Sequence, residues 1–101
     1  MRKGLLEFCI LSIIHQQEAY ASDILEKLKQ ANLLVVEGTV YPLLTRMKNE
    51  GLLSYRWQES TGGPPRKYYT LTDEGRGILA QLDVEWQSIS QAIHQITVTD
   101  K

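Results

Sequence analysis

The chain contains only one cysteine, Cys9, so no disulfide can form within it. A protein without disulfides fits a reducing compartment better than a secreted one. Cys9 lies in the apolar run LLEFCILSII, where packing inside the fold and redox sensing are the two alternatives for a thiol. We expect a cytoplasmic protein in which Cys9 packs as a small apolar side chain.

Long apolar runs are also missing. The run LLEFCILSII has ten residues and includes Glu7, whereas a membrane-spanning helix needs about 20 apolar residues. The run has no small-residue cleavage site of the kind that follows a signal peptide. The sequence therefore predicts no membrane partner.

The sequence lacks the short motifs that mark catalytic, metal and cofactor sites. It has no glycine-rich phosphate loop, no Cys/His ligand spacing and no G-x-S-x-G nucleophile motif. The two histidines, His15 and His94, are far apart in the sequence, and the carboxylates are scattered. We expect neither an enzyme nor a protein that needs a metal or a cofactor.

Positive charge is not in excess overall, but it is concentrated in the middle of the chain. The formal net charge is −1. Residues 1–37 carry −1 and residues 71–101 carry −3, whereas residues 38–70 carry +3, from five cations and two anions. Because the distribution of charge matters more than its sum for binding a polyanion, the central third is the candidate for a nucleic-acid contact.

The segment EGTVYPLLTRMKNEG, residues 37–51, predicts a helix with an unusual exposed face. Its apolar residues have the i, i+3, i+4, i+7 spacing of one helical stripe: Val40, Leu43, Leu44 and Met47. Because a helix tolerates proline in its first turn, Pro42 places the start of this helix between Gly38 and Tyr41. Gly51 should end it. The other face carries Gly38, Tyr41, Pro42, Thr45 and Asn49, with Arg46 and Lys48 beside them.

Two further helices are expected before this segment. The first, at 3–15, is apolar in every direction around its axis, so a second copy of the chain should cover part of it. The second, at 22–31, has Ser22 as its N-cap. Residues 16–19 and 32–36 are expected to be connections.

A hairpin is expected after the segment. Leu53, Tyr55 and Trp57 alternate with polar residues in the first strand, at 52–58, which indicates one covered face. The turn-forming stretch STGGPP leads to a second strand at 66–71. Three helices followed by a basic hairpin are the layout of a winged helix-turn-helix.

A long C-terminal helix follows, with Thr72 as its N-cap. Gly75 and Gly77 each weaken a helix interior, so close backbone approach should require them. Apolar residues step by four and three, the pattern of a coiled-coil seam: Leu82, Trp86, Ile89, Ile93 and Ile96. We expect an α+β, mainly α, fold with a winged helix-turn-helix domain at 1–72 and a dimerisation helix at 73–101, in a homodimer.

The exposed face of the third helix suits DNA recognition, because a recognition helix presents its outer face to the major groove while its other side anchors in the core. Thr45 can contact a base, Arg46 a guanine or a phosphate, and a tyrosine or lysine a phosphate. Cations beside the hairpin turn suit the flanking minor groove or the backbone. The candidates are Thr39, Tyr41, Pro42, Thr45, Arg46, Lys48, Arg66 and Lys67. The alternative is a winged helix that binds protein, without DNA or ligand sensing.

Trp86 allows two interpretations. It occupies a seam position, so packing between subunits is one. The other is an aromatic-walled pocket between two subunits, lined also by Phe8, for flat, apolar or cationic molecules.

Several motifs together resemble the PadR family of transcriptional regulators: GTVYP (38–42), LLTRM (43–47), EGL (50–52), RKYY (66–69), LT (71–72) and Gly75. The resemblance spans nearly the whole chain. It implies a winged helix-turn-helix, a dimerisation helix, usually a repressor, and the short subfamily with one C-terminal helix. Glu37 departs from the small polar residue expected there.

Carried over to this chain, the resemblance implies that Thr39 and Tyr41 contact the DNA backbone and that Arg66 and Lys67 contact DNA from the wing. Trp86 falls where some members hold planar drugs between subunits, and Phe8 faces the same space. A dimer should read a palindrome whose half-sites lie about 10 base pairs, or a multiple, apart. An effector near Trp86 would change the angle between the subunits and lower operator affinity.

Overall fold

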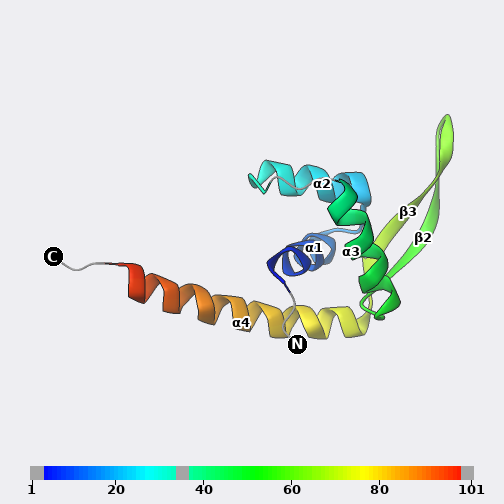
Figure 1. The fold of residues 1–101 in the computed structure, drawn as a ribbon. Helices are drawn as coiled ribbons and strands as arrows, with labels where there is room; N and C mark the ends of the chain where they lie inside the picture. The colour runs from blue at the N-terminus through cyan, green and yellow to red at the C-terminus, as the bar shows by residue number, and fades with distance from the viewer. Residues whose placement is uncertain (1–3, 34–36, 99–101) are drawn as a thin grey trace.

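The computed structural model describes residues 4–33 and 37–98, which form helices around a small antiparallel sheet (Figure 1). The elements follow in the order α1 (Leu5–Gln16), β1 (Ala19–Tyr20), α2 (Ala21–Gln30), α3 (Glu37–Asn49), β2 (Leu53–Ser60), β3 (Gly63–Leu71) and α4 (Asp73–Thr97). The strand order is β1-β3-β2. In the described part of the chain, no helix is long and apolar enough to cross a membrane.

Helix α1 lies at the centre of the core, with α2, α3, the base of the hairpin and the first part of α4 around it. Seven side chains are essentially inaccessible: Ile10, Leu11, Ile24, Leu28, Val40, Leu44 and Met47. One flank of α1 remains open in the single chain, because Leu5 is 49% exposed and Phe8 is half-buried. Burial raises the pKa of the Cys9 thiol, which lowers its thiolate fraction and favours packing over redox chemistry.

Strand β1 was not expected, because residues 16–19 were predicted to be a connection. It pairs with β3 through Ala19–Tyr69 and Tyr20–Tyr68. Two residues are too few to show an alternating pattern, so only the partner strand identifies this element. Tyr20 also precedes α2, and its N–H donates to the Asp23 carboxylate at 3.0 Å.

Helix α2 begins one residue before the predicted N-cap, so the assignment of Ser22 as the cap is wrong. Ser22 lies in the first turn, and its hydroxyl accepts a hydrogen bond from Arg66. Helix α1 begins at Leu5, later than predicted, with Gly4 in extended backbone. The predicted start at Lys3 and the connection at 34–36 lie outside the described residues.

Pro42 is the sixth residue of α3, so its predicted place in the first turn is wrong. The missing proline N–H leaves only the Gly38 carbonyl without its helical donor. Gly38 and Pro42 are both exposed, so water can hydrate that carbonyl. Gly51 ends the helix region with φ +83°, as expected.

The hairpin of β2 and β3 extends further than predicted and turns at Thr61 and Gly62, where φ of Gly62 is +77°. One of its faces is covered only at the base. Leu53 is buried and Tyr55 half-buried, but Trp57 is 61% exposed. The prediction of a covered position for Trp57 is wrong, because the hairpin projects beyond the helices (Figure 1).

Helix α4 is anchored at its start and projects away from the other elements at its end (Figure 1). The Thr72 hydroxyl accepts from the Gly75 N–H at 2.9 Å, which confirms the predicted cap. A Cβ on Gly75 would lie 2.1 Å from the Leu52 carbonyl oxygen, so close approach is confirmed there. The same prediction is wrong for Gly77, where a built Cβ would have no described atom within 4 Å apart from the backbone of its own helix and its chain neighbours.

Candidate nucleic-acid interface

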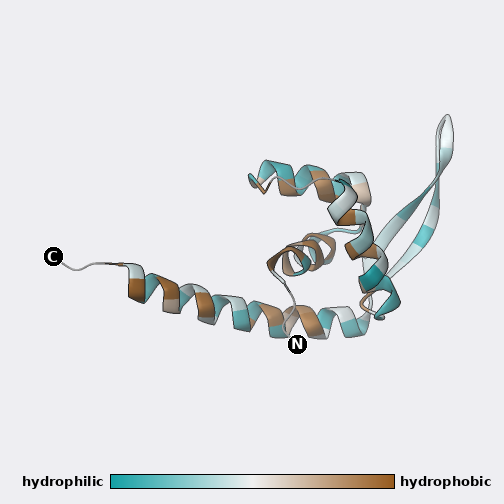
Figure 2. Cartoon of the chain, viewed as in Figure 1, coloured by the Kyte–Doolittle hydropathy of each residue, from teal (hydrophilic) through white to brown (hydrophobic). Residues whose placement is uncertain are grey.

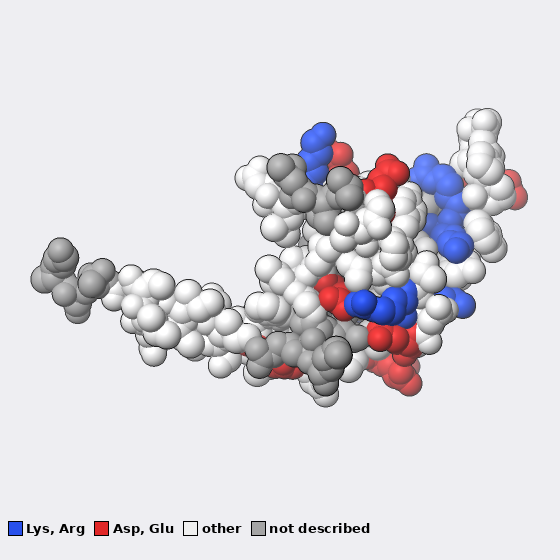
Figure 3. Space-filling view, in the orientation of Figure 1, with Lys and Arg blue, Asp and Glu red and all other residues white. Residues whose placement is uncertain are grey.

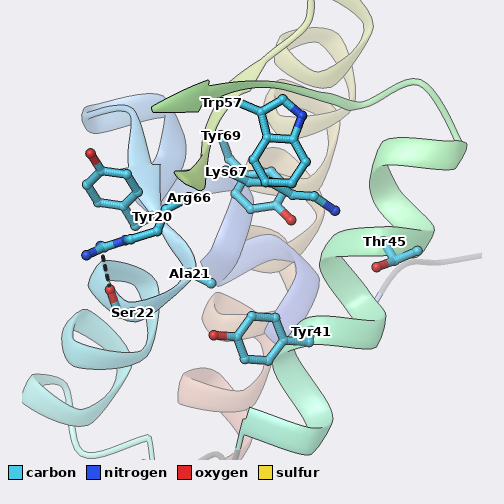
Figure 4. Close-up of a pocket in the computed structure, with 9 residues that line it drawn as sticks. All are labelled: Tyr20, Ala21, Ser22, Tyr41, Thr45, Trp57, Arg66, Lys67 and Tyr69. Atoms are coloured by element: carbon cyan, nitrogen blue, oxygen red, sulfur yellow. Dashed lines mark hydrogen bonds between the residues drawn. The ribbon is translucent and has the colours of Figure 1, made fainter. Parts of the chain in front are cut away.

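A groove of about 470 Å³ lies between the start of α2, the outer face of α3 and the hairpin (Figure 4). Residues from all three elements line it: Tyr20, Ala21, Ser22, Tyr41, Thr45, Trp57, Arg66, Lys67 and Tyr69. Four of the predicted DNA-binding residues, Tyr41, Thr45, Arg66 and Lys67, are thus brought to one groove. The other four lie on the remaining exposed surface of α3.

One wall of the groove is formed by α3. Tyr41 and Thr45 are one helical turn apart, both are exposed, and both side chains point into the groove (Figure 4). The buried side of α3, through Val40 and Leu44, fixes the helix against the core. The groove therefore presents a phenol and a small hydroxyl on a rigid element, as hydrogen-bonding contact to DNA requires.

The remaining α3 candidates have different surroundings. Thr39 and Pro42 are exposed near the start of the helix. Lys48 is exposed near its end, with its Nζ 5.8 Å from the centre of the Tyr55 ring. These positions leave their predicted contacts sterically accessible.

Arg46 is on the flank of α3 that faces α1, where its guanidinium forms an ion pair with Glu7. The Glu7 side chain is only 12% exposed, and its other oxygen accepts from the Gly4 N–H at 2.9 Å. The Arg46 side chain remains 52% exposed. Its proposed contact with DNA stays a prediction, but the side chain already joins α3 to the start of α1.

The two wing cations lie on opposite faces of β3, and both line the groove. Lys67 faces the groove, with its Nζ 4.7 Å from the centre of the Tyr55 ring and 5.6 Å from that of Trp57. The Arg66 guanidinium lies 3.8 Å from the centre of the Tyr20 ring and donates to the Ser22 hydroxyl at 3.1 Å (Figure 4). Arg66 thereby links the wing to the start of α2.

Buried Tyr69 forms part of the groove lining. Burial raises the pKa of its hydroxyl, and nearby Tyr55 and Tyr41 raise it further. The phenol therefore stays neutral at physiological pH. A neutral hydroxyl adds no negative charge to a surface that would meet phosphates.

Sequence reasoning missed five lining residues: Tyr20, Ala21, Ser22, Trp57 and Tyr69. Tyr20 is brought to the groove by strand β1, which has no sequence signal of its own. Trp57 could have been found, because it lies near the basic turn of a hairpin. A large aromatic side chain at that distance from the helices has few core residues to pack against. Figure 3 shows basic side chains over α3 and the base of the hairpin, and acidic ones over the start of α4.

The predicted seam on α4 is open over most of its length. Leu82 is buried within its own chain and Ile89 is half-buried, but Ile93 and Ile96 are 54% and 82% exposed. Figure 2 shows apolar residues recurring along α4 to its end. Leu82 is thus part of the core of one chain, and among the predicted seam residues those available to a partner begin at Trp86.

Trp86 is half-buried, and its indole Nε1 is buried without a hydrogen-bond partner among the described residues. Phe8 lines a separate hollow of about 380 Å³ between α1 and α4. Trp86 does not line that hollow, so a single chain does not place the two predicted ligand-binding residues in one pocket.

The chain matches known proteins over nearly its full length. The profile described as "Transcriptional regulator PadR-like family" matches residues 10–81. A PadR-like transcription factor from Bacteroides fragilis is 57% identical, with a TM-score of 0.82 over 96% of this chain and 94% of the other. A PadR-like transcriptional regulator from Bacillus cereus is 38% identical, with a TM-score of 0.85 over 96% and 95%.

A more distant match is Bacillus subtilis PadR, whose structure is a complex with operator DNA. It is 26% identical, with a TM-score of 0.69 over 76% of this chain and 45% of the other. Together the matches confirm the expected resemblance, and they confirm the fold class, a winged helix with a long C-terminal helix.

Proposed function

Because the chain belongs to the PadR-like family of transcriptional regulators, we propose that it is a homodimeric, DNA-binding repressor. The groove between α3 and the hairpin is the observation that carries this proposal. It places Tyr41 and Thr45 on a rigid helix opposite Lys67. Helix α3 enters the major groove, Thr45 contacts base edges, and Tyr41, Thr39, Lys48 and the wing contact phosphates.

Removing the wing cations tests this mode of binding. We expect Arg66→Gln with Lys67→Gln to weaken binding to a fluorescein-labelled mixed-sequence duplex by about tenfold or more, because phosphate contacts dominate such affinity. The slope of log K against log salt should also fall by about 2, since each phosphate contact contributes about 0.9. Fluorescence anisotropy at several salt concentrations measures both quantities.

The matched control is Lys27→Gln with Lys29→Gln, which removes the same charge from exposed positions of α2 outside the groove. Equal weakening in both double variants would contradict the proposed interface. Wild-type protein that is folded but ignores DNA at physiological salt would favour the alternative, a winged helix that binds protein.

The dimer is supported by the open apolar stripe of α4. Ile93 and Ile96 are exposed at the end of a 25-residue helix that projects from the other elements. Exposed apolar residues at seam spacing are stabilised when a second helix covers them. We therefore assign residues 73–101 to dimerisation and residues 1–72 to DNA binding.

An effector site at the dimer interface is supported by Trp86. Its buried Nε1 has no hydrogen-bond acceptor among the described residues. A bound molecule that supplies an acceptor would remove the free-energy cost of this unpaired donor. A planar aromatic molecule stacked between two copies of Trp86, near Phe8, would change the spacing of the two α3 helices. Titration with the planar cation proflavine tests this: if Trp86→Ala leaves dye affinity and dimer stability unchanged, both roles of Trp86 are wrong.

A further inference from the structure

Trp57 is a large aromatic side chain that the core does not use. It is 61% exposed, although a tryptophan stabilises a fold most when its 150–250 Å² are buried. Single exposed apolar residues are ordinary on protein surfaces. The position of Trp57 differs, because it lines the same groove as Tyr41 and Thr45 of α3.

The neighbours of Trp57 hold its ring in a defined place. Lys67 is its partner in the strand register, and the Lys67 Nζ lies 5.6 Å from the centre of the ring. Tyr55, two residues earlier on the same face, packs edge-on with ring centres 5.7 Å apart at 86°. Trp57 therefore forms a supported platform next to a cation, and one side of it remains open to the groove.

The geometry of a winged helix determines which part of DNA reaches this platform. If α3 occupies the major groove and the hairpin turn approaches the neighbouring minor groove, the strand between these two grooves must pass between α3 and the hairpin. That strand presents its sugars and phosphates to the protein. Bases would be reached from α3 and from the hairpin turn at Thr61 and Gly62.

We propose that Trp57 contacts the deoxyribose–phosphate backbone of the DNA strand that passes between α3 and the hairpin. The indole N–H can donate to a phosphate oxygen, and the ring can cover the apolar face of a deoxyribose, while Lys67 supplies the charge. This inference rests on the proposed function. Beyond that function, it assigns part of the DNA affinity to an uncharged residue in addition to the cations Arg66 and Lys67. This contribution would not depend on the DNA sequence.

An uncharged contact has a different salt signature from a cationic one. Trp57→Ala should weaken binding to duplex DNA by about tenfold, the scale of one hydrogen bond to a charged group, at every salt concentration. The slope of log K against log salt should not change, whereas Lys67→Gln should reduce it by about 0.9. Trp57→Phe keeps an aromatic face but loses the N–H, so its affinity should fall between wild type and Trp57→Ala.

Intrinsic fluorescence gives an independent readout, since Trp57 and Trp86 are the two tryptophans of the chain. Adding unlabelled duplex should quench the emission of the wild type, and this change should be absent from Trp57→Phe, which retains Trp86. The control is Gln58→Ala, an exposed neighbour on the opposite face of the strand, which should bind DNA as the wild type does. Unchanged thermal unfolding would show that each variant is folded.

The outcomes separate this inference from the proposed function. If the wild type binds DNA and Trp57→Ala binds as tightly, or changes the salt slope as Lys67→Gln does, the role of Trp57 is wrong and the proposed function stands. If folded wild type binds no duplex at any salt, both are overturned. The contact would be established by two results together. Plots of log K against log salt for the wild type and Trp57→Ala should be parallel and differ tenfold in affinity, and Trp57→Phe should lose the quenching by duplex.

Discussion

Glu7 and Arg46 form a contact that joins the start of α1 to the outer flank of α3. The sequence predicted Arg46 as a DNA contact, because an arginine on a recognition helix can bind guanine or phosphate. Glu7 was noted only as a charge that interrupts an apolar run. The structure shows why a charged residue is tolerated in this apolar run. The nearly buried Glu7 carboxylate accepts hydrogen bonds from both the Arg46 guanidinium and the Gly4 N–H.

Two substitutions of Glu7 separate these contacts. Glu7→Gln removes the ion pair but keeps an oxygen for the Gly4 N–H, so the free energy of unfolding should fall by about 0.5–1 kcal/mol, as for a half-exposed pair. Glu7→Ala also removes the acceptor at the helix start and should cost about 1–2 kcal/mol in total. Urea unfolding measures both. Glu26→Gln, an exposed position in α2, is the control, and losses no larger than its own would contradict this role.

At the scale of elements, the helices were predictable because each carries its own local signals. The stripe from Val40 to Met47, the Thr72 cap and the left-handed Gly51 each specify structure within a few residues. Strand β1 was not predictable, because Ala19 and Tyr20 become a strand only by pairing with β3. The pairing of Arg66 with Tyr20 and Ser22 depends on that strand and was hidden for the same reason.

The start of α4 provides a matched pair of glycine substitutions. Gly75→Ala would place a Cβ 2.1 Å from the backbone oxygen of Leu52, so the hairpin base and the helix must separate. We expect a loss of about 3 kcal/mol or more in the free energy of unfolding, at the upper end of overpacking costs. The Cβ of Gly77→Ala would approach no described atom beyond its own helix backbone and chain neighbours, so this variant should instead stabilise the protein by about 1 kcal/mol through helix propensity. Thermal or urea unfolding of the two variants, expressed alike, checks the contrast, and two losses of similar size would contradict it.

At the scale of the whole molecule, one chain leaves two surfaces without a partner. The groove between α3 and the hairpin lies at one end, and the apolar stripe of α4 extends from the other (Figures 1 and 2). The molecule is elongated, with extents of 61 × 27 × 21 Å, because the C-terminal end of α4 projects beyond the other elements. The sequence predicted both surfaces from residue types, but their separation depends on the direction of α4, which no local pattern specifies.

A dimer formed through α4 would place two α3 helices on one side of DNA in a two-fold arrangement. Symmetry in the protein then requires symmetry in the site, because each α3 reads the same bases on its own half. The symmetry of the preferred DNA therefore reports on the groove and on the dimer together.

The most direct measurement is selection of DNA from a random duplex pool by the wild-type protein, followed by titration of the enriched sequence at several salt concentrations. We predict a palindrome with half-sites about 10 base pairs, or a multiple, apart, and an affinity that falls steeply as salt rises. Enrichment of no sequence by protein that is folded and dimeric would contradict a sequence-reading repressor.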